Sequence, residues 1–138
     1  MIVLDTNVVS ELMRTAPDQA VLLWLNSQPV PSIFITAITV VEMQTGVEKL
    51  YPGRRRDDMQ GLVSAILGEL GGRILPFDSG AALHYAQLIG PIMRTKATME
   101  PLDYQIAAIA RFHGAAVATL NVKHFKSTGI EIINPWSS

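Results

Sequence analysis

The sequence predicts an α/β fold with a central, mainly parallel sheet. Short runs rich in apolar and β-branched residues recur along the chain, and helical stretches separate them. The first run, residues 2–4, is apolar throughout, as a strand covered on both faces should be. Hydrophobic residues make up 49% of the 138 positions and charged residues only 17%, a balance that favours a folded chain. We therefore expect residues 1–138 to form a single α/β domain.

The N-terminal half alternates strands and helices. The predicted elements are a strand at 2–4, helices at 10–13 and 18–26, a strand at 33–35, and helices at 39–50 and 57–70. Apolar residues recur at helical spacing over 39–50, which identifies that helix. Pro52-Gly53 ends it, and Gly71-Gly72 ends the helix that follows.

The C-terminal half continues the same alternation. Its predicted elements are a strand at 74–75, helices at 79–93 and 101–114, and strands at 115–119 and 130–133. Asp78 or Ser79 would cap the first of these helices. Pro101 suits the first position of the second, and Gly114 suits its C-terminal cap.

Composition excludes several classes of function. The net charge of −1 gives no overall positive field for nucleic acid, and the absence of cysteine rules out disulfides, thiolate zinc sites and a cysteine nucleophile. No basic segment precedes an apolar one at the N-terminus, and no apolar run approaches the ~18–20 residues that span a bilayer. We expect a cytoplasmic protein without a membrane partner.

Three acidic residues are the most informative feature of the chain. Asp5 ends the first strand-like run, Glu42 lies one turn into a helix, and Asp103 lies at the start of another helix. Parallel α/β sheets gather their sites beyond the carboxyl ends of strands, so the fold would bring these side chains to one edge. Clustered carboxylates repel one another unless a proton or cation neutralises them, and hard oxygen ligands suit Mg²⁺ or Mn²⁺. Metal-dependent phosphodiester chemistry is the leading hypothesis.

Each acid also has a purely structural interpretation. Asp5 would cap the next turn. Glu42 would complete a capping box with Thr39. Asp103 would complement a helix dipole. Asn121, just beyond a predicted strand, is either a turn residue or a donor to phosphate or to a metal-bound water.

Basic residues give a weaker signal. Lys123 and His124 would contact phosphate, although solvent exposure is the default expectation for both. The triplet at 54–56 precedes two aspartates and is typical of a solvated helix start. Between Arg94 and Lys126 there are five basic residues and two acids, Glu100 and Asp103, so that region would steer a phosphate backbone if Asp103 bound metal.

Five segments together resemble the PIN domain, and specifically toxins of the VapC type and their FitB-like branch. They are IVLDTNVVSEL at 2–12, ITAITVVEM at 35–43, LD at 102–103 with IAAIA at 106–110, ATLNVKHF at 118–125, and NPW at 134–136. No single segment is specific, but the set spans nearly the whole chain in the family's order. The resemblance implies a PIN-like three-layer α/β/α fold.

The resemblance also implies an activity and partners. It implies a Mg²⁺- or Mn²⁺-dependent endoribonuclease that leaves 5′-phosphate and 3′-hydroxyl ends, forms a homodimer and is inhibited by a VapB- or FitA-like antitoxin. It carries Asp5, Glu42 and Asp103 over as metal ligands, with Thr6 orienting Asp5 and Asn121 positioning water or phosphate. Two departures stand out. The family often has Asp where this chain has Asn121, which would weaken a second metal site, and Met99-Glu100-Pro101 replaces the more usual small or hydroxyl-bearing residues.

Two other classes of function stay open. One is a PIN-like module that engages an antitoxin or RNA without cleaving it, for which Asn121 is the main support. The other is phosphoryl transfer through an aspartyl-phosphate at Asp5, as in receiver or haloacid-dehalogenase-like domains. The latter enzymes need a second Asp two residues on, where this chain has Asn7.

Overall fold

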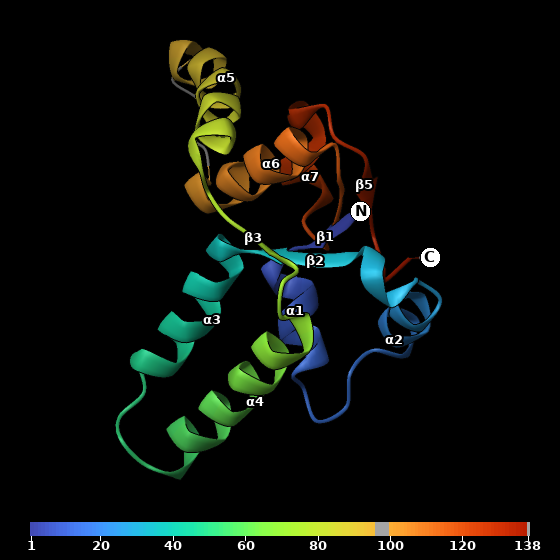
Figure 1. Cartoon of the computed structure of the whole chain (residues 1–138), viewed down its shortest axis with the longest axis vertical. Helices are drawn as coiled ribbons and strands as arrows, with labels where there is room; N and C mark the ends of the chain where they lie inside the picture. The colour runs from blue at the N-terminus through green and yellow to red at the C-terminus, as the bar shows by residue number, and fades with distance from the viewer. Residues whose placement is uncertain (96–99, 138) are drawn as a thin grey trace.

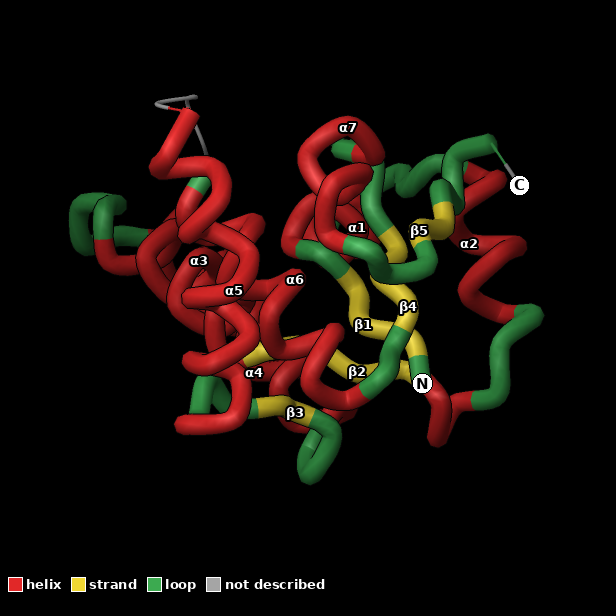
Figure 2. Tube along the Cα trace, turned by 90° about the horizontal axis from the view of Figure 1, so that it is seen from above, coloured by secondary structure: helices red, strands yellow, loops and turns green. Residues whose placement is uncertain are grey.

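The strands form one parallel sheet. The structure is a computed structural model, and it describes residues 1–95 and 100–137. In that part of the chain the sheet has five strands in the order β3-β2-β1-β4-β5, and each neighbouring pair is parallel (Figure 2). The strands are β1 (Ile2–Leu4), β2 (Ile33–Thr36), β3 (Ile74–Leu75), β4 (Ala116–Ala118) and β5 (Ile132–Ile133). The predicted α/β class is confirmed, and the last two strands are shorter than predicted.

Helices cover both faces of this sheet. They are α1 (Thr6–Leu12), α2 (Gln19–Asn26), α3 (Ala37–Glu48), α4 (Arg54–Leu70), α5 (Ser79–Thr95), α6 (Pro101–His113) and α7 (Val122–Phe125). Short 3₁₀ turns, η1 (Val30–Ser32) and η2 (Lys126–Thr128), complete the described elements. Figure 1 shows α5, α6 and α7 on one face and α1 to α4 on the other. The expected three-layer α/β/α arrangement is confirmed.

The core is correspondingly divided into two apolar clusters, one on each face of the sheet. Val3 and Val117 point into the cluster beneath α5, α6 and α7, whereas Leu4 and Ala118 point into the cluster beneath α1 to α4. This alternation follows from the two-residue period of a strand. Because both faces are covered, the strands are apolar at successive positions, which is the pattern that the sequence shows.

Several helices begin earlier than predicted. Helix α1 starts at Thr6 instead of residue 10 because Asp5 caps it, its side chain accepting the Thr6 amide. Helix α4 starts at Arg54 instead of residue 57. Helix α3 starts at Ala37, and its N-cap is Thr36, whose hydroxyl accepts the Thr39 amide at 3.3 Å.

The helix caps in the structure test three predictions made from the sequence. The capping box between Thr39 and Glu42 is wrong, because Thr39 lies inside α3 and is not its cap. Asp78 caps α5 by accepting the amide of Ala81 at 3.0 Å, as one of the two predicted alternatives. Gly114 ends α6 with a φ of 66°, a left-handed conformation that glycine adopts without a Cβ penalty, as expected. The short helix α7 was not predicted.

The strand order creates a switch point beside β1. The chain moves outward from β1 to β2 and β3, and then returns to place β4 on the other side of β1. Leu4 pairs with Ala118, so the residues that follow these two strands lie side by side. Sites in open α/β sheets form at such a point, beyond the carboxyl ends of the strands.

Within the described part of the chain, no helix is both long enough and apolar enough to span a membrane.

Candidate functional site

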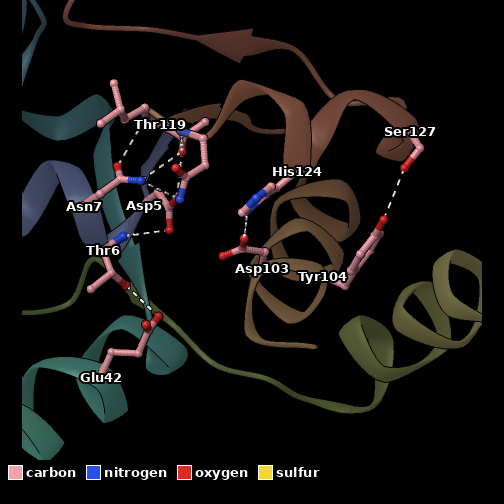
Figure 3. A network of polar contacts seen from close by, with 11 residues as sticks. Asp5, Thr6, Asn7, Glu42, Asp103, Tyr104, Thr119, His124 and Ser127 are labelled. Atoms are coloured by element: carbon pink, nitrogen blue, oxygen red, sulfur yellow. Dashed lines mark hydrogen bonds and ion pairs between the residues drawn. The ribbon is translucent and has the colours of Figure 1, made fainter. Parts of the chain in front are cut away.

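An open cleft of about 540 Å³ lies at the carboxyl ends of β1 and β4. Asp5, Glu42, Asp103 and Asn121 all line it, together with Thr6. Figure 3 shows the three acids approaching from three separate elements, the end of β1, helix α3 and helix α6. The structure therefore brings every predicted site residue to one place.

Asp5 is the buried centre of this cleft, with only 2% of its surface exposed. Its Oδ1 accepts the Thr6 amide at 2.8 Å, and its Oδ2 accepts the Thr119 hydroxyl at 2.7 Å. The side-chain amide of Asn7 also donates to Oδ2, at 3.2 Å. Neutral donors therefore hold both oxygens, and no cationic side chain among the described residues makes a salt bridge with Asp5.

Burial changes the acidity of Asp5. Burial is the main cause that raises the pKa of its carboxyl group from 3.8 to about 6, and the negative charges of Asp103 and Glu42 act in the same direction. The hydrogen bonds from Thr119 and Thr6 act in the opposite direction but do not offset burial. The three acids thus lie within electrostatic reach of one another, and a cation between them would relieve the cost of ionising Asp5.

Glu42 is tied to the same network through Thr6. The Thr6 hydroxyl donates to Oε1 of Glu42 at 2.8 Å and lies 2.9 Å from the hydroxyl of Thr39. Thr6 therefore contacts Asp5 through its backbone amide and Glu42 through its side chain. Because Thr6 opens α1 and Glu42 lies on α3, this one residue fixes the relative position of two helices and two acids.

Asp103 has its own partner, His124. Nδ1 of His124 on α7 lies 2.5 Å from Oδ2 of Asp103, which lies in the first turn of α6. The Asp103 side chain is 17% exposed and that of His124 is 43% exposed. The imidazole thus orients the carboxylate while keeping an edge toward solvent, so His124 is exposed as expected but also has a partner in Asp103.

Asn121 lies beside the acids as a neutral amide. It directly precedes α7, and its backbone amide donates to the Thr119 hydroxyl at 2.9 Å. Its side chain does not cap that helix. The turn interpretation therefore holds for the backbone of Asn121, and its side chain adds a neutral polar group to the cleft.

Sequence reasoning missed two of the residues that hold Asp5. Asn7 and Thr119 also bond each other at 3.3 Å, and Asn7 accepts the amide of Leu120 at 3.2 Å, which joins the ends of β1 and β4. The available signal in the sequence was that polar residues directly follow two apolar, strand-like runs. Only the parallel pairing of the two strands shows that these residues meet.

A second missed group lies on the wall formed after α1. Glu11 is 8% exposed, and its carboxylate accepts the Asp18 amide at 2.9 Å and the Arg14 guanidinium at 3.3 Å. Glu11 and Arg14 both line the cleft, as does Trp136 from the C-terminal segment. The i,i+3 spacing of Glu11 and Arg14 is compatible with their pairing, but nothing in the sequence indicated that Trp136 shares the cleft with them.

The basic triplet at the start of α4 is solvated, as expected. Arg54 is 94% exposed and lies 3.9 Å from Asp58, and Arg56 pairs with Glu48 at 2.8 Å. Of the other sequence features, Lys96 and Met99 lie outside the described residues.

The chemistry of the cleft suits a divalent cation held by water and oxygen. Among the described residues, no three carboxylate or imidazole groups close into a ready-made metal cage. The three acids instead line an open space around a buried carboxyl group with a raised pKa. Mg²⁺ typically keeps several waters and binds through one or two carboxylates plus substrate phosphates, so an open acidic cleft fits it.

Comparisons with known proteins show which family and fold the chain resembles. The family model described as the PIN domain matches residues 2–130. The VapC ribonuclease Y4jK of Sinorhizobium fredii is 42% identical over 99% of this chain and 98% of its own length. Toxin FitB of Neisseria gonorrhoeae is 37% identical over 99% of both chains. The crystal structure of FitAcB from the same organism superposes with a TM-score of 0.91 at 36% identity, covering both chains completely.

Proposed function

The chain belongs to the PIN domain family, and from that premise we propose that it is a metal-dependent endoribonuclease, the toxin of a VapC-type toxin–antitoxin pair. A relative with 42% identity is named a ribonuclease and another with 37% identity is named a toxin. The resemblance noted from the sequence points the same way.

One observation carries the proposal: three carboxylates from distant parts of the chain line one open cleft at the switch point of a parallel sheet. A structural role alone does not explain why Asp5 is buried next to two further acids. Among the described residues, no cationic side chain balances its charge. Such an arrangement costs stability unless the site binds something positive.

We assign the metal to Asp5, Glu42 and Asp103. A bound Mg²⁺ or Mn²⁺ would supply an activated water and positive charge opposite the scissile phosphate. Thr6 orients Glu42 with its hydroxyl and Asp5 with its amide, and His124 orients Asp103. Each acid thus has a neighbour that fixes the direction of its lone pairs, as supporting groups do around metal ligands.

The remaining residues of the cleft position water and substrate. Asn121 places a neutral amide beside the acids, where it would hold a water or a phosphate oxygen without adding negative charge. Thr119 and Asn7 keep Asp5 fixed when the site fills. Asn7 stands where an aspartyl-phosphate enzyme of the dehalogenase type needs its second acid, so hydrolysis by water is favoured over transfer through Asp5.

The proposal includes partners and a location. We infer a cognate antitoxin as inhibitor, because the FitB relative is named a toxin and was crystallised as FitAcB. A homodimer is part of the same proposal. An RNA substrate places the protein in the cytoplasm.

A second candidate is a PIN-like module that binds antitoxin or RNA without cleavage. Asn121 favours it, because an amide binds a cation more weakly than the carboxylate often found at this position in the family. Three carboxylates nevertheless remain in the cleft, which is why hydrolysis is the main proposal.

The test is cleavage of single-stranded and structured RNA by metal-free protein given Mn²⁺, Mg²⁺ or EDTA. Wild type should cleave with either metal, leave 5′-phosphate ends and stop in EDTA. Asp103→Asn should fall below about one hundredth of that rate, more than the loss of a supporting residue usually costs. Glu131→Gln removes an exposed acid that does not line the cleft and should cleave like wild type.

Equal cleavage by wild type and a folded Asp103→Asn would remove Asp103 from the site. RNA binding without cleavage in any metal would favour the binding module.

A further inference from the structure

The acids occupy only part of the cleft, and the rest of its wall has a different chemistry. Arg14, Leu120 and Trp136 line the same space. Among the described lining residues Arg14 is the one cation, and Trp136 is the one aromatic side chain. A site that only held a metal ion would need neither of them.

Arg14 is held in place at this wall. Both oxygens of the buried Glu11 lie 3.3 Å from its Nη1, and Glu11 is itself anchored by the Asp18 amide. Among the described residues Arg14 is bound through Nη1 only, so its Nη2 and Nε keep donors for a ligand, and 67% of the side chain is exposed. A guanidinium fixed at one end with free donors at the other suits a phosphate group.

Trp136 is fixed as well. Its backbone amide donates to Oδ1 of Asn134 at 3.0 Å, and its side chain packs against the core cluster beneath α1 to α4. Leu120, 50% exposed, follows β4 on the same cleft. An indole held against a core, with a leucine on the same wall, is an apolar surface on which a nucleobase can stack.

We propose that this wall is a subsite for one unstacked nucleotide, with the base against Trp136 and Leu120 and a phosphate on Arg14. The inference rests on the proposed nuclease function, because it names the substrate class of the same cleft. The cleft volume of about 540 Å³ falls within the range of small-ligand sites, about 300 to 1,000 Å³.

The subsite defines which RNA the cleft accepts. A base can lie against Trp136 only after it has left its own stack, so the substrate is single-stranded RNA or a loop with splayed bases. The acids then act at the scissile phosphate, while Arg14 and Trp136 hold the neighbouring nucleotide.

Adenosine 5′-monophosphate is a suitable probe because it carries a base and a phosphate but no internucleotide bond to cleave. It is titrated into the Mg²⁺-loaded full chain while the indole N–H signals are followed by NMR. The chain has two tryptophans, and Trp24→Phe assigns them. The Trp136 signal should shift on binding and that of the buried Trp24 should not.

Variants then separate the two contacts. Arg14→Gln should weaken binding of the nucleotide about tenfold and leave binding of adenosine unchanged. Trp136→Leu should weaken binding of both at least about fivefold, whereas Trp136→Phe keeps an aromatic face and should stay near wild type. Arg54→Gln removes a more exposed cation from α4, outside the cleft, and should change nothing.

Two outcomes would contradict the subsite. In the first, the Trp136 signal does not shift when the protein is saturated with nucleotide. In the second, nucleotide binding is the same in wild type, Arg14→Gln and a folded Trp136 variant. Nucleotide binding unaffected by Arg14→Gln, with loss of antitoxin binding in that variant, would make this wall a protein-docking surface instead.

The test is independent of cleavage. If the nucleotide binds as described while RNA stays intact, the subsite stands and the nuclease proposal fails. If RNA is cleaved but the nucleotide titration is indifferent to the variants, only the subsite fails.

Discussion

Asp5 links protein stability to pH because its carboxyl group is buried in the fold. Its pKa of about 6 in the folded chain exceeds the ordinary value of 3.8, so the folded chain binds more protons between about pH 4 and pH 6. The free energy of unfolding therefore falls as pH rises through that window, by about 3 kcal/mol at most, and the loss is complete above pH 6. Cation binding opposes this loss because it favours the ionised form.

Substitution isolates this effect. In EDTA, wild type should lose stability between pH 4 and pH 7 relative to Asp5→Asn, which has no carboxyl group to ionise there. Urea unfolding at each pH measures the difference, and Glu131→Gln should run parallel to wild type. Parallel curves for wild type and Asp5→Asn would show that the carboxyl group is not perturbed.

Thr6 offers a second prediction at the scale of one residue. Thr6→Val keeps the shape of the side chain but removes the hydroxyl that donates to Glu42. We expect Mn²⁺ affinity and RNA cleavage to fall about 10- to 100-fold, as for other supporting groups around metal ligands. Isothermal titration with Mn²⁺ measures the affinity without relying on catalysis.

Thr6→Ser is the matched control because it restores the hydroxyl. Equal Mn²⁺ affinity in Thr6→Val and wild type would show that this hydrogen bond does not support the metal site. Low affinity in Thr6→Ser as well would show that the Thr6 methyl group is needed in addition to the hydroxyl.

At the scale of elements, the close approach of α5 and α6 depends on Gly80. A Cβ at this position would lie 2.3 Å from the tip of the Phe112 ring, so either the ring or the helices would have to shift. Gly80→Ala should therefore destabilise the protein by about 1–3 kcal/mol, the usual cost of overpacking. In a Phe112→Ala background the same substitution should cost nothing, because the clash is gone.

Thermal unfolding of the four proteins in this double-mutant cycle measures the coupling. A similar cost of Gly80→Ala in both backgrounds would place the strain elsewhere in α5.

Periodicity and caps predicted most elements but not all their limits. The alternation of apolar runs and helical stretches was enough to identify every strand, and Pro101 and Gly114 marked the ends of α6. The start of α1 was missed because Asp5 was expected to cap only a turn, whereas it caps a helix that begins at Thr6. Helix α7 was missed because a four-residue segment has too few positions to show a period.

The candidate site was predictable where backbone topology decides it. Asp5, Glu42 and Asp103 follow strands or open helices, and a parallel sheet brings such positions together. The contact between His124 and Asp103 was not predictable, because it depends on rotamers and on how the ends of α6 and α7 meet. The i,i+3 spacing of Glu11 and Arg14 allowed their pairing, but nothing in the sequence placed that pair at the cleft.

At the scale of the whole molecule, the topology explains how the fold holds so much negative charge in one place. The order β3-β2-β1-β4-β5 puts the ends of β1 and β4 beside each other, and α3 and α6 then direct Glu42 and Asp103 toward Asp5. Two apolar clusters on either side of the sheet stabilise the frame against that repulsion. Repulsion between these acids therefore lowers the stability of the metal-free protein, and a bound cation would relieve it.

Binding of Mn²⁺ to the metal-free protein, followed by the electron paramagnetic resonance signal of the free ion, tests the central claim most directly. Wild type should bind at least one ion per chain. Asp5→Asn, Glu42→Gln and Asp103→Asn should each weaken binding at least about tenfold, and Glu131→Gln should not change it. Absence of binding by folded wild type, or equal affinity in all five proteins, would contradict the claim that these three carboxylates form a metal site.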